Sequence, residues 1–502
     1  FLKWENIARR IGELIAEGTY LNEKEQEAYV AYKEQKVKEA AEKENAILVG
    51  VAAEAMDDVA DMIDAVSDIS DEIEDRVEQE ETKPVIALGN NNHNYHITDD
   101  HLGEGGAKEK FRRNVEAIRT LKQIEAEGRA AIPEEQEVLS KYVGWGGLPD
   151  AFDEHKENWS GEYVELKGLL TPEEYVSAKS STLNAHYTSP VIIREMYKAL
   201  EHMGFEKGNI LEPSMGIGNF FGMLPERMDE SRLYGVEKDD ISGRIAKQLY
   251  PTAGISISGF EKAPFPNDFF DLAIGNVPFG EYGVADPAYD KNHFLIHDYF
   301  LAKSLDKVRA GGMIAFITTS GTMDKQNSSA RKYLAQRADL IGAVRLPNDA
   351  FKKNAGAEVS TDILFFQKRD RLQDIEPDWV HLGMDENGIT INQYFVDHPE
   401  MIAGHMEMVS GPFGMKAQCI ADPGVEFADR LSKCMSYLDG RYEAIEQDAE
   451  NAVEYASIPA DPNVQNNSFT VVDDKVYYRE NSIMVPAEVS GNTEERIKGM
   501  VG

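Results

Sequence analysis

Residues 210–220 read ILEPSMGIGNF, and this stretch decides the fold class. The apolar run that ends at Glu212 predicts a buried strand, and the glycines after it predict a tight turn into a helix. Gly216 and Gly218 permit backbone conformations and close approaches that larger residues resist. In a parallel sheet such a turn lies at the carboxyl end of a strand, where ligands bind. The stretch is therefore a candidate binding loop, and a plain tight turn is the alternative.

Outward from this turn, short apolar runs alternate with helical stretches between residues 183 and 368. We expect strands at 209–213, 232–237, 255–260, 271–276 and 312–319, and helices at 190–202, from about 219, and at 240–250, 294–309 and 328–338. This alternation predicts a mostly parallel sheet covered by helices on both faces. The last two strands, 340–346 and 361–367, have no helix between them, which predicts an antiparallel hairpin at the sheet edge. The fold class is α/β and Rossmann-like, preceded by helical segments.

Tyr234-Gly235-Val236-Glu237 ends the second strand of this series with an acid. An acid about 20 residues beyond a glycine-rich turn is placed to accept hydrogen bonds from ribose hydroxyls. The turn and the acid together predict a ligand that carries a nucleoside. A dinucleotide and S-adenosylmethionine both qualify, although the glycine spacing differs from the G-x-G-x-x-G of dehydrogenases.

The stretch Asn276-Val277-Pro278-Phe279 follows a buried strand and favours amine chemistry. The planar amino group of a base donates two hydrogen bonds, which the Asn276 side-chain oxygen and the Val277 carbonyl can accept. Such acceptors favour a nitrogen that becomes tetrahedral as it attacks a methyl group. Pro278 stiffens the turn, and Phe279 offers a face on which a flipped base can stack. A proline turn that caps a strand is the alternative.

Taken in order, these motifs resemble the DNA adenine-N6 methyltransferases of the gamma class, in which the cofactor motif precedes the catalytic motif. The resemblance covers residues 183–368 and implies S-adenosylmethionine as the cofactor and DNA as the substrate. It implies a cofactor site formed by Tyr187, Thr188, Glu212, Pro213, Gly216, Gly218, Glu237 and Phe260. It assigns catalysis to Asn276, Val277, Pro278 and Phe279, and stacking on the base to Phe279 and Phe351. It implies no metal.

Three positions depart from this family's pattern. Gly259 stands where the family has an acid beside the cofactor adenine, and Glu261 is the candidate substitute. Val277 replaces a proline whose backbone carbonyl carries the role, and Phe279 replaces a tyrosine whose ring carries it. We therefore expect Val277 and Phe279 to be compatible with catalytic activity.

A narrower resemblance links the chain to the very large methyltransferase–helicase proteins of conjugative elements and phages. Residues 142–149 (YVGWGGLP), 181–188 (STLNAHYT) and 392–395 (NQYF) carry it. It implies that a mobile element modifies its own DNA against restriction, with a helicase region in the same full-length chain. This sequence contains no G-x-x-x-x-G-K-[ST] loop, so we expect no ATP hydrolysis from it. We interpret Gly144-Trp145-Gly146-Gly147 as a packed corner, with base stacking as the alternative.

We expect four regions along the chain. These are an acidic helical region at 1–100, a helical arm at 101–182, the methyltransferase domain at 183–370, and a C-terminal extension or linker at 371–502. The sequence starts without Met or a signal-peptide pattern and reads like an internal piece of a longer protein. No apolar run approaches the roughly 18 residues of a membrane span, so we expect a cytoplasmic protein.

The charge balance limits how the chain can meet DNA. Its 502 residues include 89 acidic and 52 basic side chains, for a formal net charge of −37. An overall basic clamp is excluded, whereas a local basic groove is not. Candidate phosphate contacts are Arg112, Arg113, Lys122, Arg331, Lys332, Lys352 and Lys353, with ordinary solvated charges as the alternative. The acidic helix predicted at 54–81 is a solvated face, a DNA mimic or a docking site for a basic partner.

Other functions remain open from the sequence. A protein-glutamine methyltransferase is possible because an amide nitrogen is chemically close to an adenine amine, although Phe351 and the helical arm favour DNA. A catalytically weak DNA-binding or antirestriction protein is the second alternative. A nucleotide-dependent oxidoreductase is disfavoured because the glycine spacing of this sequence differs from the G-x-G-x-x-G of dehydrogenases. Cys419 and Cys434 support neither a disulfide scaffold nor a zinc module.

Overall fold

The computed structural model divides the chain into two compact units, Phe1–Ile86 and Ala87–Gly502. The described residues are 93–182, 187–351, 359–411, 414–442, 458–472, 475–487 and 497–498, all in the second unit. The acidic helix predicted at 54–81, His186, Lys352 and Lys353 lie outside them. No helix in the described ranges is both long enough and apolar enough to cross a lipid bilayer.

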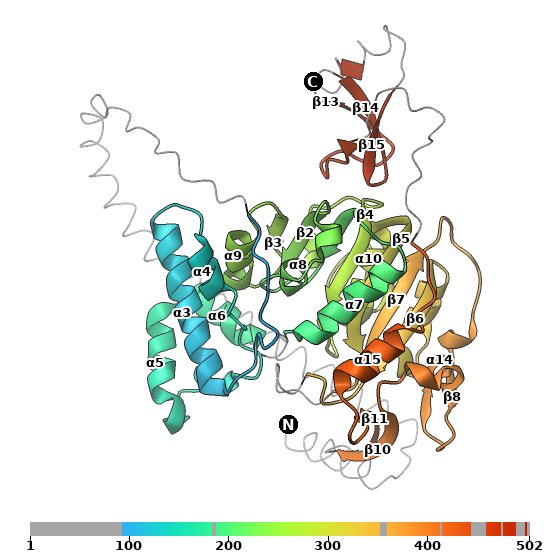
Figure 1. Ribbon diagram of the computed structural model, residues 1–502, viewed down its shortest axis with the longest axis horizontal. Helices are drawn as coiled ribbons and strands as arrows, with labels where there is room; N and C mark the ends of the chain where they lie inside the picture. Colours follow the sequence, from blue (N-terminus) through green and yellow to red (C-terminus); the bar gives the residue numbers. More distant parts are fainter. Residues whose placement is uncertain are drawn as a thin grey trace, which may run out of the picture. The chain divides into compact units, whose positions relative to one another are not determined.

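A seven-stranded sheet with the order β3-β2-β1-β4-β5-β7-β6 forms the centre of the second unit (Figure 1). The strands are β1 (Asn209–Glu212), β2 (Arg232–Glu237), β3 (Gly254–Ile257), β4 (Phe270–Asn276), β5 (Val308–Thr319), β6 (Ala338–Leu346) and β7 (Thr361–Lys368). The first five pair in parallel, and β7 runs antiparallel to both β5 and β6. This order confirms the predicted Rossmann-like methyltransferase fold with an antiparallel hairpin at one edge.

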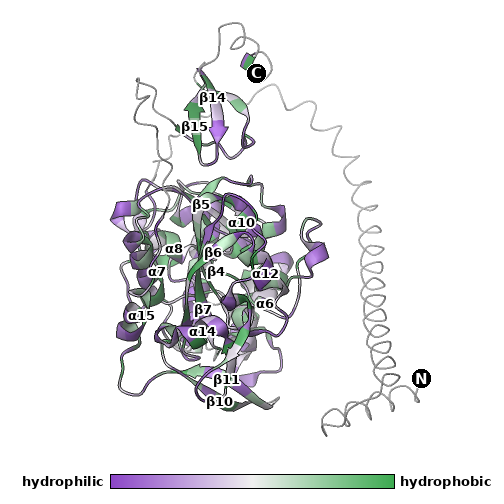
Figure 2. Cartoon of the chain, turned by 90° about the vertical axis from the view of Figure 1, so that its right-hand side faces the viewer, coloured by the Kyte–Doolittle hydropathy of each residue, from purple (hydrophilic) through white to green (hydrophobic). Residues whose placement is uncertain are grey.

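Helices cover both faces of this sheet, with α7, α8 and α15 (Phe427–Met435) on one face and α10 and α12 on the other (Figure 2). The helices within the domain are α7 (Pro190–His202), α8 (Asn219–Gly222), α9 (Asp240–Leu249), α10 (Ile296–Lys307), α11 (Gly321–Asp324) and α12 (Ser329–Ala335). Pro190 starts α7 at a position where its missing N–H costs no hydrogen bond. Asp239 caps α9 by accepting hydrogen bonds from Ser242 N and Oγ at 2.9 and 2.7 Å.

The helix predicted from about residue 219 is a single turn. A Cβ at Gly222 would lie 2.6 Å from both Ile97 and Tyr250, so the chain turns where these side chains pack against it. Pro225 follows three residues later and cannot continue a helix. Helix α10 is shorter than predicted because β5 already begins at Val308.

The arm before the sheet contains four helices, on the left in Figure 1. They are α3 (Ala107–Ala126), α4 (Pro133–Leu139), α5 (Ser160–Leu169) and α6 (Pro172–Ser181). Trp145 lies between them with 0% of its surface exposed and contacts Phe111, Tyr142 and Phe152 edge-on. The packed corner predicted for this tryptophan is therefore confirmed. One hydrophobic core joins the arm to the sheet.

Short 3-10 helices join several of the larger elements. They are η1 (Pro149–Phe152), η2 (Glu157–Trp159), η3 (Glu226–Met228), η4 (Phe260–Lys262), η5 (Asp290–Asn292), η6 (Asp378–Val380) and η7 (Pro399–Met401).

Beyond the central sheet, the described residues form small sheets and further helices. They comprise β8 (Leu382–Met384), β9 (Thr390–Asn392), α14 (Gln393–Asp397), β10 (His405–Gly411), β11 (Gly414–Ile420), α15 (Phe427–Met435), β12 (Ile458–Pro459), β13 (Phe469–Val472), β14 (Lys475–Glu480) and β15 (Ile483–Pro486). Asn392 donates from Nδ2 to the carbonyls of Met323 and Trp379 at 2.8 and 2.9 Å. The guanidinium of Arg345 lies 4.3 Å from the centre of the Phe395 ring. The NQYF segment therefore anchors this part of the chain to the sheet.

Candidate active site

A cavity of about 660 Å³ opens where β1, β2, β3 and β4 end. It is lined by the turns that follow these strands, by the first turns of α10, and by residues of the arm. The predicted site residues that line it are Tyr187, Thr188, Glu212, Pro213, Gly216, Glu237, Phe260, Asn276, Val277, Pro278 and Phe279. Gly218 and Phe351 are the two predicted site residues that do not line it.

Gly218 serves the packing of the turn. It has a φ of +87°, and a Cβ there would lie 2.5 Å from the ring of Tyr250 and 3.0 Å from Cε of Met215. Its N–H donates to the Met215 carbonyl at 2.7 Å. Gly216, with a φ of +55°, is the glycine of this turn that faces the cavity. The predicted ligand contact of Gly218 is thus not found, because Tyr250 and Met215 occupy the space beside it.

Glu237 holds the turn after β1 in place. Its Oε2 accepts from Gly216 N and its Oε1 from Asp239 N, both at 2.7 Å. Burial raises the pKa of Glu237 to about 7, and the negative charge of Asp239 adds to the shift. Each carboxylate oxygen has a second lone pair, so both can still accept from a ligand hydroxyl.

Glu212 is a buried acid inside the cavity wall, with 2% of its surface exposed. Its Oε2 has no hydrogen-bond partner among the described residues. Burial raises the pKa of Glu212 well above the ordinary carboxyl range, and the charge of Glu237 adds to this. A buried polar atom of this kind is costly unless a ligand satisfies it.

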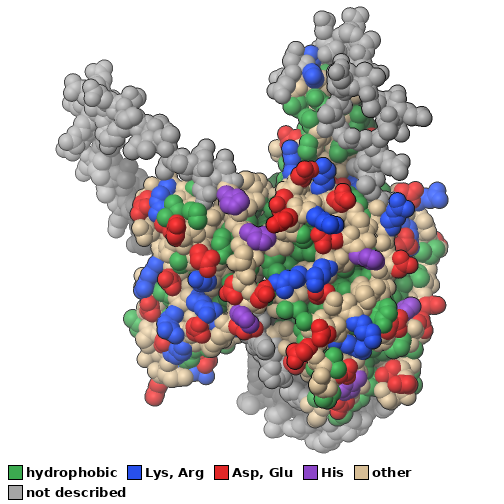
Figure 3. Space-filling view, viewed as in Figure 1, with side chains coloured by type: hydrophobic (Ala, Val, Ile, Leu, Met, Phe, Trp, Pro, Cys, Tyr) green, Lys and Arg blue, Asp and Glu red, His purple; other side chains and the backbone are tan. Residues whose placement is uncertain are grey.

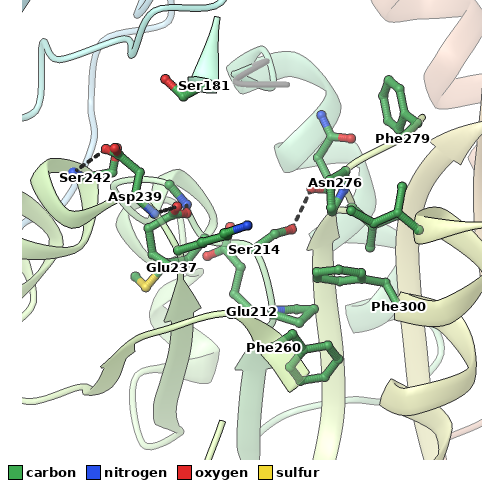
Figure 4. A pocket seen from close by; sticks show the side chains of 18 of the residues that line it. Ser181, Glu212, Ser214, Glu237, Asp239, Ser242, Phe260, Asn276, Phe279 and Phe300 are labelled. Carbon is green, nitrogen blue, oxygen red and sulfur yellow. Dashed lines mark hydrogen bonds between the residues drawn. The ribbon is translucent and has the colours of Figure 1, made fainter. Parts of the chain in front are cut away.

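Asn276 ends β4 with its side chain oriented by a neighbour. Its Nδ2 donates to Thr188 Oγ1 at 3.2 Å, and Ser214 Oγ donates to its backbone carbonyl at 2.9 Å. Figure 4 shows the side-chain oxygen on the side of Phe279 and away from Glu237. The turn therefore presents an amide oxygen beside an aromatic ring, as predicted from the sequence.

Two phenylalanines form an apolar wall below this turn in Figure 4. The rings of Phe260 and Phe300 have centroids 5.1 Å apart, and their exposed fractions are 2% and 7%. Phe300 comes from α10 and was not predicted. An apolar wall next to polar acceptors strengthens each hydrogen bond made there, because the local dielectric is low.

Phe351, the predicted second aromatic of the base site, is buried with 5% of its surface exposed. It belongs to the hydrophobic core and is absent from the cavity wall. The sequence showed an aromatic near the edge hairpin but not which way its ring packs.

Glu261, the candidate substitute for an acid at position 259, lies beside Gly259. Gly259 and Glu261 both line the cavity. A Cβ at Gly259 would lie 2.3 Å from both carboxylate oxygens of Glu261. The Glu261 carboxylate therefore occupies the space into which a side chain at 259 would extend.

The arm contributes a serine-lined wall that the sequence analysis missed. Ser177, Ser180 and Ser181 of α6 line the cavity, and Ser177 Oγ donates to Asp239 Oδ1 at 2.8 Å. In Figure 4, Ser181 lies across the cavity from Glu212. The serine-rich run at 176–182 was the available signal, but only the packing of α6 against α9 gives it a role.

Arg244 of α9 clamps the arm at this position. Its guanidinium contacts Glu125 and Asp240 at 2.6 Å and Glu174 at 2.8 Å. Burial alone would raise the pKa of Glu174, but hydrogen bonds from Lys122 and Arg244 lower that pKa to about 2. Glu174 also caps α6 by accepting from Thr171 N at 2.9 Å. The clamp therefore fixes the helix that carries the serines.

The structure contradicts one candidate phosphate contact and finds acidic partners for three others. Arg331 is 1% exposed and donates to the carbonyls of Val380, Thr322 and Lys325, so it cannot reach a phosphate. Lys122 pairs with Glu174, Lys332 with Glu376, and Arg113 with Glu109. Acidic and basic side chains are interspersed over the face seen in Figure 3.

Comparison with known proteins gives a distant relative. No family model matches the chain. Over 274 residues, it is 27% identical to "Defense against restriction protein B" of Escherichia phage P1. This match covers 53% of the chain and 10% of the phage protein, so the chain spans about a tenth of the length of this curated relative.

Solved structures with a similar arrangement include three methyltransferase-related proteins. A Listeria monocytogenes protein assigned to the class I S-adenosylmethionine-dependent methyltransferases is 16% identical with a TM-score of 0.33, covering 54% of this chain and 90% of that chain. A protein assigned as a modification subunit of a type I restriction enzyme from Vibrio vulnificus is 14% identical with a TM-score of 0.33, covering 57% and 88%. A type I restriction-modification methyltransferase subunit from Streptococcus thermophilus is 13% identical with a TM-score of 0.37, covering 68% and 76%. The fold assignment rests on the strand order and pairing described above.

Proposed function

We propose that this chain is an S-adenosylmethionine-dependent methyltransferase that acts on the exocyclic amine of an adenine flipped out of DNA. The observation that carries the proposal is a single cavity in which two sets of groups meet. One set is the glycine turn and acids after β1 and β2, and the other is the Asn276-Val277-Pro278-Phe279 turn after β4. The first suits a nucleoside cofactor, and the second suits a planar amine.

The residues present fit this cofactor. Glu237 accepts hydrogen bonds from ribose hydroxyls, and Phe260 provides an apolar surface for the adenine ring. The unpartnered Oε2 of Glu212 suits the cationic amino group of the methionine end, which would favour the ionised carboxylate. The chemistry supplied by a bound cofactor is an electrophilic methyl group on a sulfonium centre. A volume of about 660 Å³ lies within the range of small-molecule sites.

The chain's own residues then position the target amine. Asn276 Oδ1 and the Val277 carbonyl accept its two N–H bonds, while Phe279 stacks on the base. Positive charge develops on the nitrogen during methyl transfer, and the two oxygens stabilise that charge more strongly than they stabilise the neutral amine. Thr188 holds the Asn276 amide so that its oxygen faces the base. The surplus proton leaves to solvent after transfer, so no strong base is required.

Protection of mobile-element DNA from restriction is the proposed biological role. The likeness to "Defense against restriction protein B" supports this role. A helicase region in the same full-length protein is part of the proposal, and it rests on the resemblance of residues 142–149, 181–188 and 392–395.

Protein-glutamine methylation is the second candidate. The burial of Phe351 favours this candidate. Phe351 was one of the two features of the sequence that favoured DNA as the substrate, and it does not line the cavity. The amide of a glutamine side chain presents the same planar nitrogen to Asn276 as an adenine does.

One experiment separates the candidates. Mixed-sequence DNA and a pool of glutamine-containing peptides are incubated with the protein and methyl-labelled cofactor, and both are then digested and analysed by mass spectrometry. The proposal expects N6-methyladenine in the DNA and no label in the peptides, with Asn276→Ala as the inactive control. Methylated cytosine alone, label in the peptides alone, or no label in either pool would contradict it.

A further inference from the structure

Tyr282 is an exposed aromatic at the rim of the cavity, three residues beyond the catalytic turn. Its exposed fraction is 45%, whereas Phe260 and Phe300 deeper in the same wall are at 2% and 7%. Among the large apolar side chains that are exposed in the described part of the chain, Tyr282 alone lines the cavity. An exposed aromatic ring beside a binding cavity offers a face on which a base can stack.

The ring of Tyr282 covers the backbone of Gly280. A Cβ at Gly280 would lie 2.4 Å from Cε1 and 2.8 Å from Cδ1 of this ring. The Cδ1–Cε1 edge of the ring therefore lies against the turn that follows Phe279, and any larger residue at 280 would push the ring away. Gly280 is a position that the resemblance to methyltransferases does not explain.

The loop that carries Tyr282 is fixed to α10 at two points. The Tyr282 carbonyl accepts from Ile296 N at 2.8 Å, at the start of the helix. Further along the loop, the buried Asp286 accepts from Tyr299 Oη and Lys303 Nζ, each at 2.8 Å. Gly283, Val284 and Ala285, between these anchors, also line the cavity. The backbone position of the loop is thus set by folding, and a ligand does not have to order the loop.

We infer that Tyr282 is the second aromatic surface of the substrate site and stacks on the target base as the base enters the cavity. This inference rests on the proposed function, because it takes the substrate to be a nucleobase. It replaces Phe351, whose ring is buried in the core. Stacking acts through the aromatic face, so the contribution belongs to the ring and not to the hydroxyl.

The test uses Tyr282→Ala and Tyr282→Phe in the full chain, with Tyr437→Ala as the matched control. Tyr437 is another exposed tyrosine, at 48%, and it does not line the cavity. Methylation of mixed-sequence DNA is measured over a range of DNA concentrations, and cofactor affinity is measured by titration calorimetry. Loss of one base stack predicts a KM for DNA about tenfold or more higher in Tyr282→Ala. Tyr437→Ala should match the wild type, the KM of Tyr282→Phe should lie closer to the wild type than to Tyr282→Ala, and cofactor affinity should not change in any variant.

The outcomes are distinguishable. Equal KM values in Tyr282→Ala and Tyr437→Ala overturn the inference, and so does a Tyr282→Phe variant as impaired as Tyr282→Ala. Weakened cofactor binding in Tyr282→Ala also overturns it, since the ring would then belong to the cofactor wall. Failure of the wild-type protein to methylate DNA contradicts the proposed function instead.

Discussion

On the β1–β2 side of the cavity Glu237 accepts hydrogen bonds from the protein's own backbone, whereas on the β4 side Asn276 donates its amide N–H to the side chain of Thr188. Glu237 accepts two backbone N–H groups at 2.7 Å, and a helix of the arm closes over it. Asn276 has its amide nitrogen 3.2 Å from Thr188 and lies beside a half-exposed aromatic loop. The β1–β2 side, which we call the cofactor half, has this part of its hydrogen bonding formed without a ligand. The β4 side, which we call the base half, has an exposed aromatic ring at its rim, which suits a large substrate that enters from solvent. Substitutions in the first half should therefore alter folding and binding together, and those in the second should alter turnover.

The largest expected effect tests the β4 side. Asn276→Ala removes one preorganised acceptor of the charge that develops on the target nitrogen, so we expect turnover to fall about 100-fold or more. Cofactor affinity should stay within about twofold, because Asn276 faces the base. Single-turnover methylation combined with titration calorimetry checks both quantities. A variant that keeps its turnover but loses the cofactor would reverse the assignment of the two halves.

On the β1–β2 side, Glu237→Ala should weaken S-adenosylmethionine binding by about 1.5–3 kcal/mol, the scale of hydrogen bonds to a charged group. It should also lower the melting temperature of the ligand-free protein, because the N–H groups of Gly216 and Asp239 lose their acceptor. Glu134→Ala, in the exposed first turn of α4, is the control for the loss of one carboxylate outside the cavity and should leave cofactor affinity unchanged. An unchanged cofactor affinity in Glu237→Ala would remove the residue from the site.

Gly218 distinguishes packing from ligand contact. Gly218→Ala should destabilise the fold by about 1–3 kcal/mol, because it combines a positive φ with overpacking against Tyr250. Gly128→Ala is the control, since its φ of +61° carries the backbone strain while nothing lies within 4 Å of the added Cβ. The difference between the two unfolding free energies, from denaturant titration, measures the packing alone. Equal values would show that the Tyr250 contact relaxes freely.

Glu237 also makes cofactor binding depend on pH. Burial raises the pKa of Glu237 to about 7, so the carboxyl is largely protonated at pH 6 and ionised at pH 8. The ionised form is the stronger acceptor for ribose hydroxyls, so affinity should rise by about tenfold from pH 6 to pH 8 and then level off. Calorimetry across this range checks the rise. Glu237→Gln should flatten the profile, and a profile unchanged in that variant would assign the titration to another group.

The sequence predicted those parts of the site that depend on local pattern. A strand that ends in a glycine turn or in Asn276-Val277-Pro278-Phe279 places the residues of that turn at the carboxyl end of the sheet. This placement does not depend on how the rest of the chain packs. Phe351, Arg331 and the serines of α6 could not be assigned in this way. Their roles depend on which distant segment packs against them, such as Arg244 against Glu125, 119 positions apart. Contacts between residues so far apart in the sequence cannot be predicted from local sequence patterns.

The smallest expected effect concerns that clamp, which joins the arm to the cofactor half. Arg244→Ala removes its contacts with Glu125, Glu174 and Asp240, but it leaves the Lys122–Glu174 pair and the capping of α6 in place. A partly exposed cluster of this kind contributes about 1 kcal/mol, so the serine wall should loosen and cofactor affinity should fall by about fivefold. Turnover at saturating cofactor should not change, because no residue of the β4 turn touches the clamp. The wild-type affinity should fall toward that of Arg244→Ala as salt is raised, since salt screens the same contacts.

Arg227→Ala, which removes a cation from η3 outside the cavity wall, is the control and should keep wild-type affinity. Loss of turnover in Arg244→Ala would mean that the arm supports the base half as well, and the division between the two halves would not hold.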